Sequence, residues 1–333
     1  MFHQKTTVAV LRGGPSREYN ISLKSGAAVL EALDRERYEP RDVFIDRAGV
    51  WHVHGAPLSP DKALRNVDVA FNALHGEYGE DGRIQRELDL LGTPYTGAGS
   101  IASALSFNKQ RTKDMVAALG IKVPHGAVLP RPADVSPDIL EREALTLFRS
   151  FPMPAMVKPI VGGSSIGMTF ANDFSSLFAG LENAFEMSPR ALVEEFIRGR
   201  EATVGVIDDF RGESLYALLP AEIVPHQSHS FFDYEAKYDG STLELCPGRF
   251  TESEKQELMD AARRAHQALE LSHYSRSDFI VSRRGIYFLE ANSAAGVGLS
   301  KESILPKALQ AVGTKLSDFL SHIIELARGG KRN

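Results

Sequence analysis

Short apolar segments alternate with glycine-containing loops and helical segments in the first part of the chain. Residues 6–11 are apolar and β-branched, Gly-Gly-Pro-Ser interrupts them at 13–16, and helical periodicity begins at Ser22. The same order recurs where the apolar run 67–74 leads through a loop into a helical pattern over residues 80–91. A repeated strand–loop–helix order predicts a parallel sheet.

Two polar side chains lie in the loops that follow these predicted strands. Glu18 follows the first strand and His75 follows the second. Parallel sheets gather their ligand-binding loops at the carboxyl ends of the strands. We therefore expect Glu18 and His75 to be neighbours facing one crevice.

The remaining pattern predicts a long helix, a small α+β unit and a final α+β unit. The long helix is expected over residues 100–119, ended by Gly120. The elements expected further on are strands at 156–158, 166–170, 191–197, 202–207 and 215–219, helices near 175–184 and 253–269, a hairpin within 277–292 and a closing helix through Leu326. This organisation predicts three domains at residues 1–98, 99–193 and 194–333.

The last predicted hairpin places four polar side chains together. Folding the chain about Arg284 pairs Asp278 with Glu290 and Arg276 with Asn292, and the two-residue period of strands puts all four on one face. Opposed carboxylates repel unless a cation lies between them or one is protonated. Oxygens of Asp, Glu and Asn suit Mg²⁺. A solvated polar face with a register shifted by one residue is the alternative.

A glycine-rich segment predicts a phosphate-binding loop. Residues 161–167 read Val-Gly-Gly-Ser-Ser-Ile-Gly and follow Lys158 closely. Glycines let backbone amides close around phosphate oxygens, and a lysine adds a point charge. A flexible hairpin loop is the alternative. Lys109 and Lys113, one turn apart on the long helix, are by themselves more typical of a solvated helix face than of a binding site.

Composition narrows the class of protein. Lys and Arg total 38 and Asp and Glu total 43, giving a net charge of −5, so no basic surface for nucleic acid is expected. No apolar run approaches the ~18 residues of a membrane span, and no signal peptide is evident. The single cysteine, Cys246, fits a reducing compartment. We expect a cytoplasmic protein without membrane or nucleic-acid partners.

The order of the motifs resembles that of D-alanine–D-alanine ligases. The matching segments are Gly-Gly-Pro-Ser-Arg-Glu at 13–18, Leu-His-Gly-Glu-Tyr-Gly-Glu-Asp-Gly at 74–82, Lys-Pro at 158–159, Gly-Ser-Ser-Ile-Gly-Met at 163–168, Glu-Ala-Lys-Tyr at 235–238, Arg-Ser-Asp-Phe at 276–279 and Leu-Glu-Ala-Asn at 289–292. They cover nearly the whole chain. The resemblance implies the ATP-grasp fold, a mixture of α/β and α+β units that holds ATP between two α+β units, with an N-terminal parallel-sheet α/β domain.

The resemblance also implies a role for each matching residue. The residues implied for ATP are Lys109, Lys158, Ser165, Glu194, Ile197, Glu201, Phe231 and Lys237. Those implied for the metal, Mg²⁺ or in its place Mn²⁺, are Asp278, Glu290 and Asn292. Those implied for catalysis are Glu18, Ser164, Tyr238, Arg276 and Gly296, and those for the amino-acid substrates are His75, Ser303 and Ile304.

The implied reaction forms D-alanyl-D-alanine for peptidoglycan synthesis. ATP phosphorylates the carboxylate of one D-alanine, and the amine of a second D-alanine attacks the resulting acyl phosphate. A homodimer is expected by analogy with the family.

The chain departs from the family after Asn292. The family usually has Thr, a variable residue, Pro and Gly there, whereas this chain reads Ser-Ala-Ala-Gly from Ser293, and the stretch before Ser303 is slightly longer. Asn108 also replaces the usual aspartate before Lys109. A ligase of the same mechanism with another second amino or hydroxy acid, or a nucleotide sensor without turnover, are the alternatives.

Overall fold

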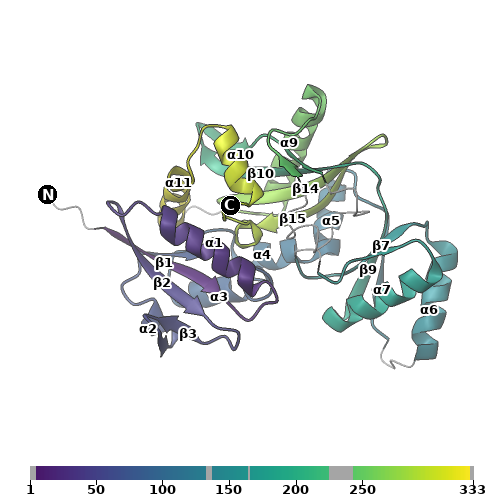
Figure 1. The fold of residues 1–333 in the computed structure, drawn as a ribbon, viewed down its shortest axis with the longest axis horizontal. Helices are drawn as coiled ribbons and strands as arrows, with labels where there is room; N and C mark the ends of the chain where they lie inside the picture. The colour runs from purple at the N-terminus through teal and green to yellow at the C-terminus, as the bar shows by residue number, and fades with distance from the viewer. Residues whose placement is uncertain (1–4, 133–136, 164–165, 225–242, 331–333) are drawn as a thin grey trace.

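The computed structural model describes residues 5–132, 137–163, 166–224 and 243–330. Their strands form three sheets, of five, six and four strands. Figure 1 shows the six-stranded sheet between the five-stranded sheet, drawn in purple and blue, and the four-stranded sheet, drawn in teal.

The five-stranded sheet is built from the N-terminal part of the chain. Its elements are β1 (Thr6–Gly13), α1 (Tyr19–Ala32), β2 (Tyr38–Ile45), β3 (Trp51–Val53), β4 (Ala56–Leu58), α2 (Pro60–Ala63), β5 (Val69–Asn72) and α3 (Arg83–Leu90). The strand order is β4-β3-β2-β1-β5, and β1 pairs in parallel with both β2 and β5. The expected parallel pairing is confirmed for β2, β1 and β5, whereas β3 and β4 extend the sheet as antiparallel strands.

Helix α1 begins at Tyr19 rather than at Ser22 as the periodicity predicted. Ser22 is fully buried, and its hydroxyl donates to the carbonyl of Ala73 at 2.9 Å and accepts from the amide of Gly13 at 2.8 Å. Ser22 therefore joins the helix to the sheet instead of capping the helix.

Residues 100–119 form two helices rather than the single helix predicted. They are α4 (Ser100–Phe107) and α5 (Lys109–Ala118). Asn108 leaves the helical conformation, and its side chain accepts from the amide of Arg111 at 3.1 Å, which caps α5. The amide of Lys109 donates to the carbonyl of Ile160 at 3.0 Å, so a tertiary contact holds the break.

The four-stranded sheet is antiparallel and carries its helices on one face. Its elements are β6 (Gly126–Pro130), α6 (Pro137–Ser150), β7 (Ala155–Pro159), β8 (Thr169–Ala171), α7 (Phe174–Met187) and β9 (Arg190–Glu195), with strand order β6-β9-β7-β8. Apolar side chains of α6 and α7 cover the sheet and form one core cluster with it.

The six-stranded sheet is also antiparallel. Its elements are β10 (Arg200–Phe210), β11 (Glu213–Ala217), β12 (Ala221–Val224), β13 (Leu243–Leu245), α9 (Glu252–Ala268), β14 (Tyr274–Ser282) and β15 (Gly285–Ser293). The chain ends with the 3₁₀ helix η1 (Ala294–Gly296), α10 (Ile304–Ala311) and α11 (Leu316–Arg328).

One hydrophobic core joins the beginning and the end of the chain. Val8 and Phe71 of the five-stranded sheet belong to the same buried cluster as Leu305 of α10 and Phe319 and Ile323 of α11. The closing helices therefore cover a face of the first sheet, and Figure 1 shows α11 beside α1 on this sheet. The domain ranges 1–98, 99–193 and 194–333 stay a proposal.

Within the described ranges, no helix is both long enough and apolar enough to cross a membrane.

Candidate active site

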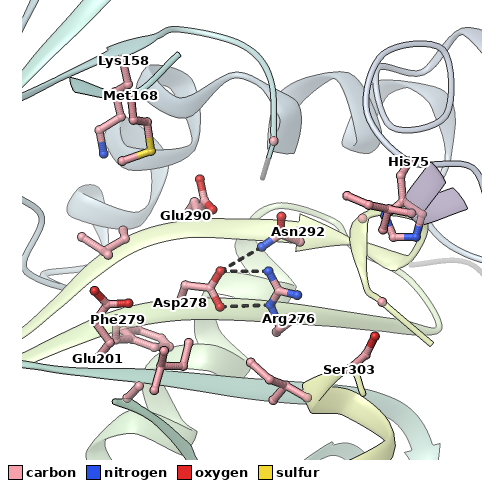
Figure 2. A pocket seen from close by; sticks show the side chains of 18 of the residues that line it. His75, Lys158, Met168, Glu201, Arg276, Asp278, Phe279, Glu290, Asn292 and Ser303 are labelled. Atoms are coloured by element: carbon pink, nitrogen blue, oxygen red, sulfur yellow. Dashed lines mark hydrogen bonds and ion pairs between the residues drawn. The ribbon is translucent and has the colours of Figure 1, made fainter. Parts of the chain in front are cut away.

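A cavity of about 580 Å³ lies among the three sheets. Side chains from α1, the loop after β5, β7, β9, β10, the β14–β15 hairpin and the segment between η1 and α10 line it. Its size is that of a small-molecule site. Figure 2 shows the hairpin residues facing this space, with Lys158 and Met168 on its opposite side and His75 at one end.

The β14–β15 hairpin presents the four polar side chains as predicted. Asp278 pairs with Glu290 and Arg276 with Asn292. Nearer the turn the predicted register is wrong, because Ser282 pairs with Gly285 around a tighter turn. A β-bulge between Asp278 and Phe279 shifts the register by one residue and restores the predicted pairing at the site.

Asp278 is held by three neighbouring side chains. The guanidinium of Arg276 donates from Nε to Oδ1 and from Nη2 to Oδ2, both at 3.0 Å, as drawn in Figure 2. Asn292 Nδ2 donates to Oδ2 at 3.2 Å, and the Thr203 hydroxyl donates to Oδ1 at 2.5 Å. The orientation of Asp278 is therefore determined before any ligand binds. Thr203 comes from the adjacent strand β10, and no motif in the sequence indicates its part in the site.

Glu290 is balanced by a separate cation. Lys109 Nζ lies 3.1 Å from Glu290 Oε2 and also donates to the carbonyl of Gly162. Burial alone would lower the pKa of Lys109, but Glu290, together with the charges of Glu80 and Glu18, outweighs burial and leaves the pKa raised. The two opposed carboxylates are thus each compensated by a side-chain cation, Arg276 for Asp278 and Lys109 for Glu290.

The donor set of the hairpin fits a hard divalent cation. Two carboxylates and one amide share a face that lines the cavity. Because Asn292 Nδ2 donates to Asp278, its amide oxygen is directed away from Asp278, toward the side on which Figure 2 shows Glu290. Hard divalent ions prefer oxygen ligands of this kind.

A cluster of buried charged side chains, Lys113, Lys158 and Glu194, lies where α5 meets the four-stranded sheet. Glu194 Oε2 lies 2.6 Å from Lys158 Nζ, and Glu194 Oε1 accepts from Lys113 Nζ. Burial would raise the pKa of Glu194, but the two lysines outweigh it and lower that pKa. Burial, only partly offset by Glu194, lowers the pKa of Lys113 to about 7. The alternative of a solvated lysine face is wrong, since Lys109 and Lys113 are 9% and 3% exposed.

The two predicted loop residues are neighbours, and a third acid joins them. Glu18, His75 and Glu80 are all buried, with one ring nitrogen and two carboxylate oxygens within 4.8 Å of one another. Burial, and then the charge of Arg276, lowers the pKa of His75 to about 3, so its imidazole is neutral. Burial, and then the charge of Glu18, raises the pKa of Glu80. Glu80 lies in the motif at 74–82 but had no predicted role.

Two glycines allow close approach to these acids. A Cβ on Gly163 would lie 2.8 Å from Glu18 Oε2, and a Cβ on Gly296 would lie 2.2 Å from Glu80 Oε2. The backbone of the glycine-rich loop therefore lies against Glu18, and the backbone of η1 lies against Glu80. Ser303 and Ile304, at the start of α10, line the same cavity.

Apolar side chains surround the other end of the cavity. They include Met156, Met168, Phe196, Ile197 and Leu289, with Glu201 among them. Apolar side chains beside an acidic one suit the base and the ribose of a nucleoside. The residues Ser164, Ser165, Phe231, Lys237 and Tyr238 lie outside the described residues.

Two family models match adjoining parts of the chain. The model described as D-ala D-ala ligase C-terminus matches residues 115–325, and the one described as D-ala D-ala ligase N-terminus matches residues 7–63 and 55–98. The chain belongs to the D-alanine–D-alanine ligase family. The family predicted from the motifs is confirmed.

Curated relatives match the chain end to end. A D-alanine–D-alanine ligase of Syntrophobacter fumaroxidans is 37% identical over 98% of this chain and 99% of the relative. A D-alanine–D-alanine ligase of Desulfotalea psychrophila is 38% identical over 97% of this chain and 95% of the relative.

Solved structures of the family share the fold. The VanG D-Ala:D-Ser ligase of Enterococcus faecalis superposes with a TM-score of 0.81 at 29% identity, covering 97% of this chain and 100% of that one. D-alanyl-alanine synthetase A of Vibrio cholerae superposes with a TM-score of 0.82 at 26% identity, covering 99% of this chain and 100% of that one. The expected fold class is confirmed.

The segment in which this member of the D-alanine–D-alanine ligase family departs from the motif is ordered. Ser293 ends β15, and the residues that replace the usual proline segment form η1. Val297 and Leu299 are buried, so the segment packs against the body of the protein. It leads to Ser303, whose amide donates to the carbonyl of Ser300 at 2.9 Å.

Proposed function

We propose that this chain joins two D-alanine molecules in an ATP-dependent, ADP-forming reaction that supplies D-alanyl-D-alanine for peptidoglycan synthesis. The observation that carries the proposal is the convergence of Arg276, Asp278, Glu290 and Asn292 on one cavity in a chain that matches the ligase family over its full length. The cavity is large enough for a nucleotide and a small amino acid together.

The first step transfers the γ-phosphoryl group of ATP to the carboxylate of the first D-alanine. The ammonium groups of Lys109 and Lys158 are buried beside the cavity and would bind phosphate oxygens. Glu194 and the Ile197 backbone would bind the adenine, and Glu201 the ribose. Ser165, Phe231 and Lys237 remain proposed ATP-binding residues.

Asp278, Glu290 and Asn292 would hold a divalent cation, for which we propose Mg²⁺, with Mn²⁺ as a substitute. Such an ion, when bound, neutralises charge on a transferring phosphoryl group. Arg276 already binds Asp278 through two hydrogen bonds, so the carboxylate has a single orientation toward the site.

The second step forms the peptide bond. The amine of the second D-alanine attacks the acyl phosphate carbon, and inorganic phosphate leaves. Glu18 would bind the ammonium group of the first D-alanine. His75 would lie beside the carboxylate group of that same D-alanine, which becomes the acyl phosphate. Arg276 and the backbone at Gly296 would stabilise the oxyanion. Ser164 and Tyr238 are proposed to hydrogen-bond with Glu18.

The second D-alanine would be held through its carboxylate by Ser303 and Ile304. These residues begin α10, and the N-terminus of a helix favours negative charge. A ligase with a different second amino or hydroxy acid is less favoured, because the curated relatives from Syntrophobacter fumaroxidans and Desulfotalea psychrophila bear the D-alanine–D-alanine ligase name.

The test is phosphate release from ATP with D-alanine alone, followed by mass identification of the product and by a panel of other acceptors. D-alanyl-D-alanine formed efficiently from D-alanine alone supports the proposal. Phosphate release only with another acceptor would change the second substrate, and ATP binding without phosphate release with any acceptor would favour a nucleotide sensor.

We further propose a homodimer in the cytoplasm. The homodimer rests on analogy with the family, and the reducing location rests on the lone, free Cys246. Light scattering across a concentration series tests the oligomeric state.

A further inference from the structure

Ser25 connects two parts of the cavity that the proposed function assigns to different substrates. It lies on α1 and is 1% exposed. Its hydroxyl oxygen lies 3.0 Å from Nε2 of His75 and accepts from the backbone amide of Leu299 at 3.4 Å. His75 is on the side of the first D-alanine, and Leu299 is in the segment that leads to Ser303.

The hydrogen bonds of Ser25 determine which nitrogen of His75 carries the proton. The amide of Leu299 can only donate, so the Ser25 oxygen is an acceptor toward it. If His75 Nε2 also donated to this oxygen, the buried hydroxyl proton of Ser25 would have no acceptor among the described residues, which is costly, so the hydroxyl donates to Nε2. A neutral imidazole that accepts at Nε2 carries its proton on Nδ1. His75 then offers an N–H donor to whatever the cavity binds.

We propose that Ser25 is a positioning residue that holds His75 in the tautomer protonated on Nδ1 and, through Leu299, aligns the segment that binds the second substrate. This inference rests on the proposed function for the identity of the two substrates. An Nδ1–H donor suits the carboxylate of the first D-alanine, whereas the opposite tautomer would present a lone pair to it.

Contacts in the segment after Leu299 make the position of Ser303 depend on the position of Leu299. Leu299 is buried, and the hydroxyls of Ser300 and Ser303 lie 3.0 Å apart. Gly298 approaches Ser303 so closely that a Cβ there would be 2.6 Å from its Oγ. A displacement of Leu299 would therefore move Ser303, the residue proposed to bind the second carboxylate.

The same helix provides a matched control. Ser22 is as buried as Ser25, but its hydroxyl bonds only to the backbone of Gly13 and Ala73, away from the cavity. Ser22→Ala therefore removes a buried hydroxyl of α1 without touching His75 or Leu299.

The kinetic experiment compares the wild type, Ser25→Ala and Ser22→Ala over a wide range of D-alanine concentration. We expect Ser25→Ala to raise KM by about tenfold at each D-alanine site, because one buried hydrogen bond contributes about a factor of ten to binding. We expect kcat to fall by a smaller factor than the rise in KM. We expect Ser22→Ala to change neither KM. Equal KM values for Ser25→Ala and the wild type, or equal increases in both variants, would overturn the proposal.

The tautomer is tested without turnover by nitrogen NMR of protein labelled with ¹⁵N-histidine, with His75→Gln used to assign the signal. The wild type should show the imidazole protonated on Nδ1, and Ser25→Ala should show a redistribution between the two nitrogens. Protonation on Nε2 in the wild type would overturn the inference even if Ser25→Ala does not fold. A wild type that forms no D-alanyl-D-alanine would instead refute the proposed function and leave the NMR result standing.

Discussion

At the scale of residues, the acidic side chains around the cavity differ in whether a neighbouring cation compensates their charge. Asp278 is bound by Arg276 and Glu290 by Lys109, so each of these carboxylates has a cation beside it. Glu80 is different, because burial and the neighbouring Glu18 raise its pKa. The cavity therefore combines paired carboxylates with one that favours its neutral form.

Replacing Glu290 with Gln should lower kcat by about 100-fold or more, since charge stabilisation of a phosphoryl group is worth several kcal/mol. The variant keeps the shape of the side chain but removes the charge that faces the buried Lys109, so the fold should be kept with a lower melting temperature. Turnover measured against magnesium concentration checks this. Glu325→Gln, which breaks only exposed pairs with Arg37 and Arg328, is the control. Full activity in Glu290→Gln would contradict the metal assignment.

Glu80 predicts a pH dependence of stability. The native chain holds the Glu80 proton to a higher pH than the unfolded chain, whose carboxyl titrates near 4.5. The free energy of unfolding contributed by this group is therefore present below pH 4.5 and is lost as pH rises through the native pKa. Glu80→Gln has no proton to lose and keeps an acceptor for the Gly76 amide.

We expect Glu80→Gln to melt at a higher temperature than the wild type at about pH 8, with the difference shrinking as the pH is lowered toward 4.5. Melting curves at several pH values measure it. A difference that does not change with pH would show that Glu80 does not titrate in this way.

At the scale of elements, features that depend on residues close together in the sequence could be predicted, and features that depend on contacts between distant residues could not. The pairing of Asp278 with Glu290 was predictable because strand periodicity and a turn signal are local, although the bulge that produces this pairing was not. The break at Asn108 was missed because a contact with Ile160, distant in sequence, holds it. Burial of Lys113 and Glu80 was missed because only the assembled sheets exclude water from them.

The cap of α5 gives a prediction at this scale. Asn108→Ala should lower the free energy of unfolding by about 1 kcal/mol, the usual value of an N-cap side chain. Asn108→Asp keeps the acceptor for the Arg111 amide and should match or exceed the wild type. Urea denaturation of the two variants distinguishes them, and equal stability of the alanine variant and the wild type would show that the cap contributes nothing.

At the scale of the whole molecule, the cavity is bounded by elements of all three sheets, so a bound ligand links them. ADP with magnesium at a hundred times its Kd should raise the free energy of unfolding by about 2.7 kcal/mol. Excess EDTA should remove most of the gain in melting temperature, because Asp278, Glu290 and Asn292 would lose the cation. A shift that EDTA leaves unchanged would contradict a metal-assisted site.

The core shared by β1, β5 and the closing helices has a consequence for how the chain is made. Val8 and Phe71 are synthesised before the other two sheets, whereas Phe319 and Ile323, which cover them, are synthesised after those sheets. A nascent chain that has not yet made α11 therefore exposes an apolar face of its first sheet. The appearance of α11, rather than completion of the first sheet, is the event that closes this core.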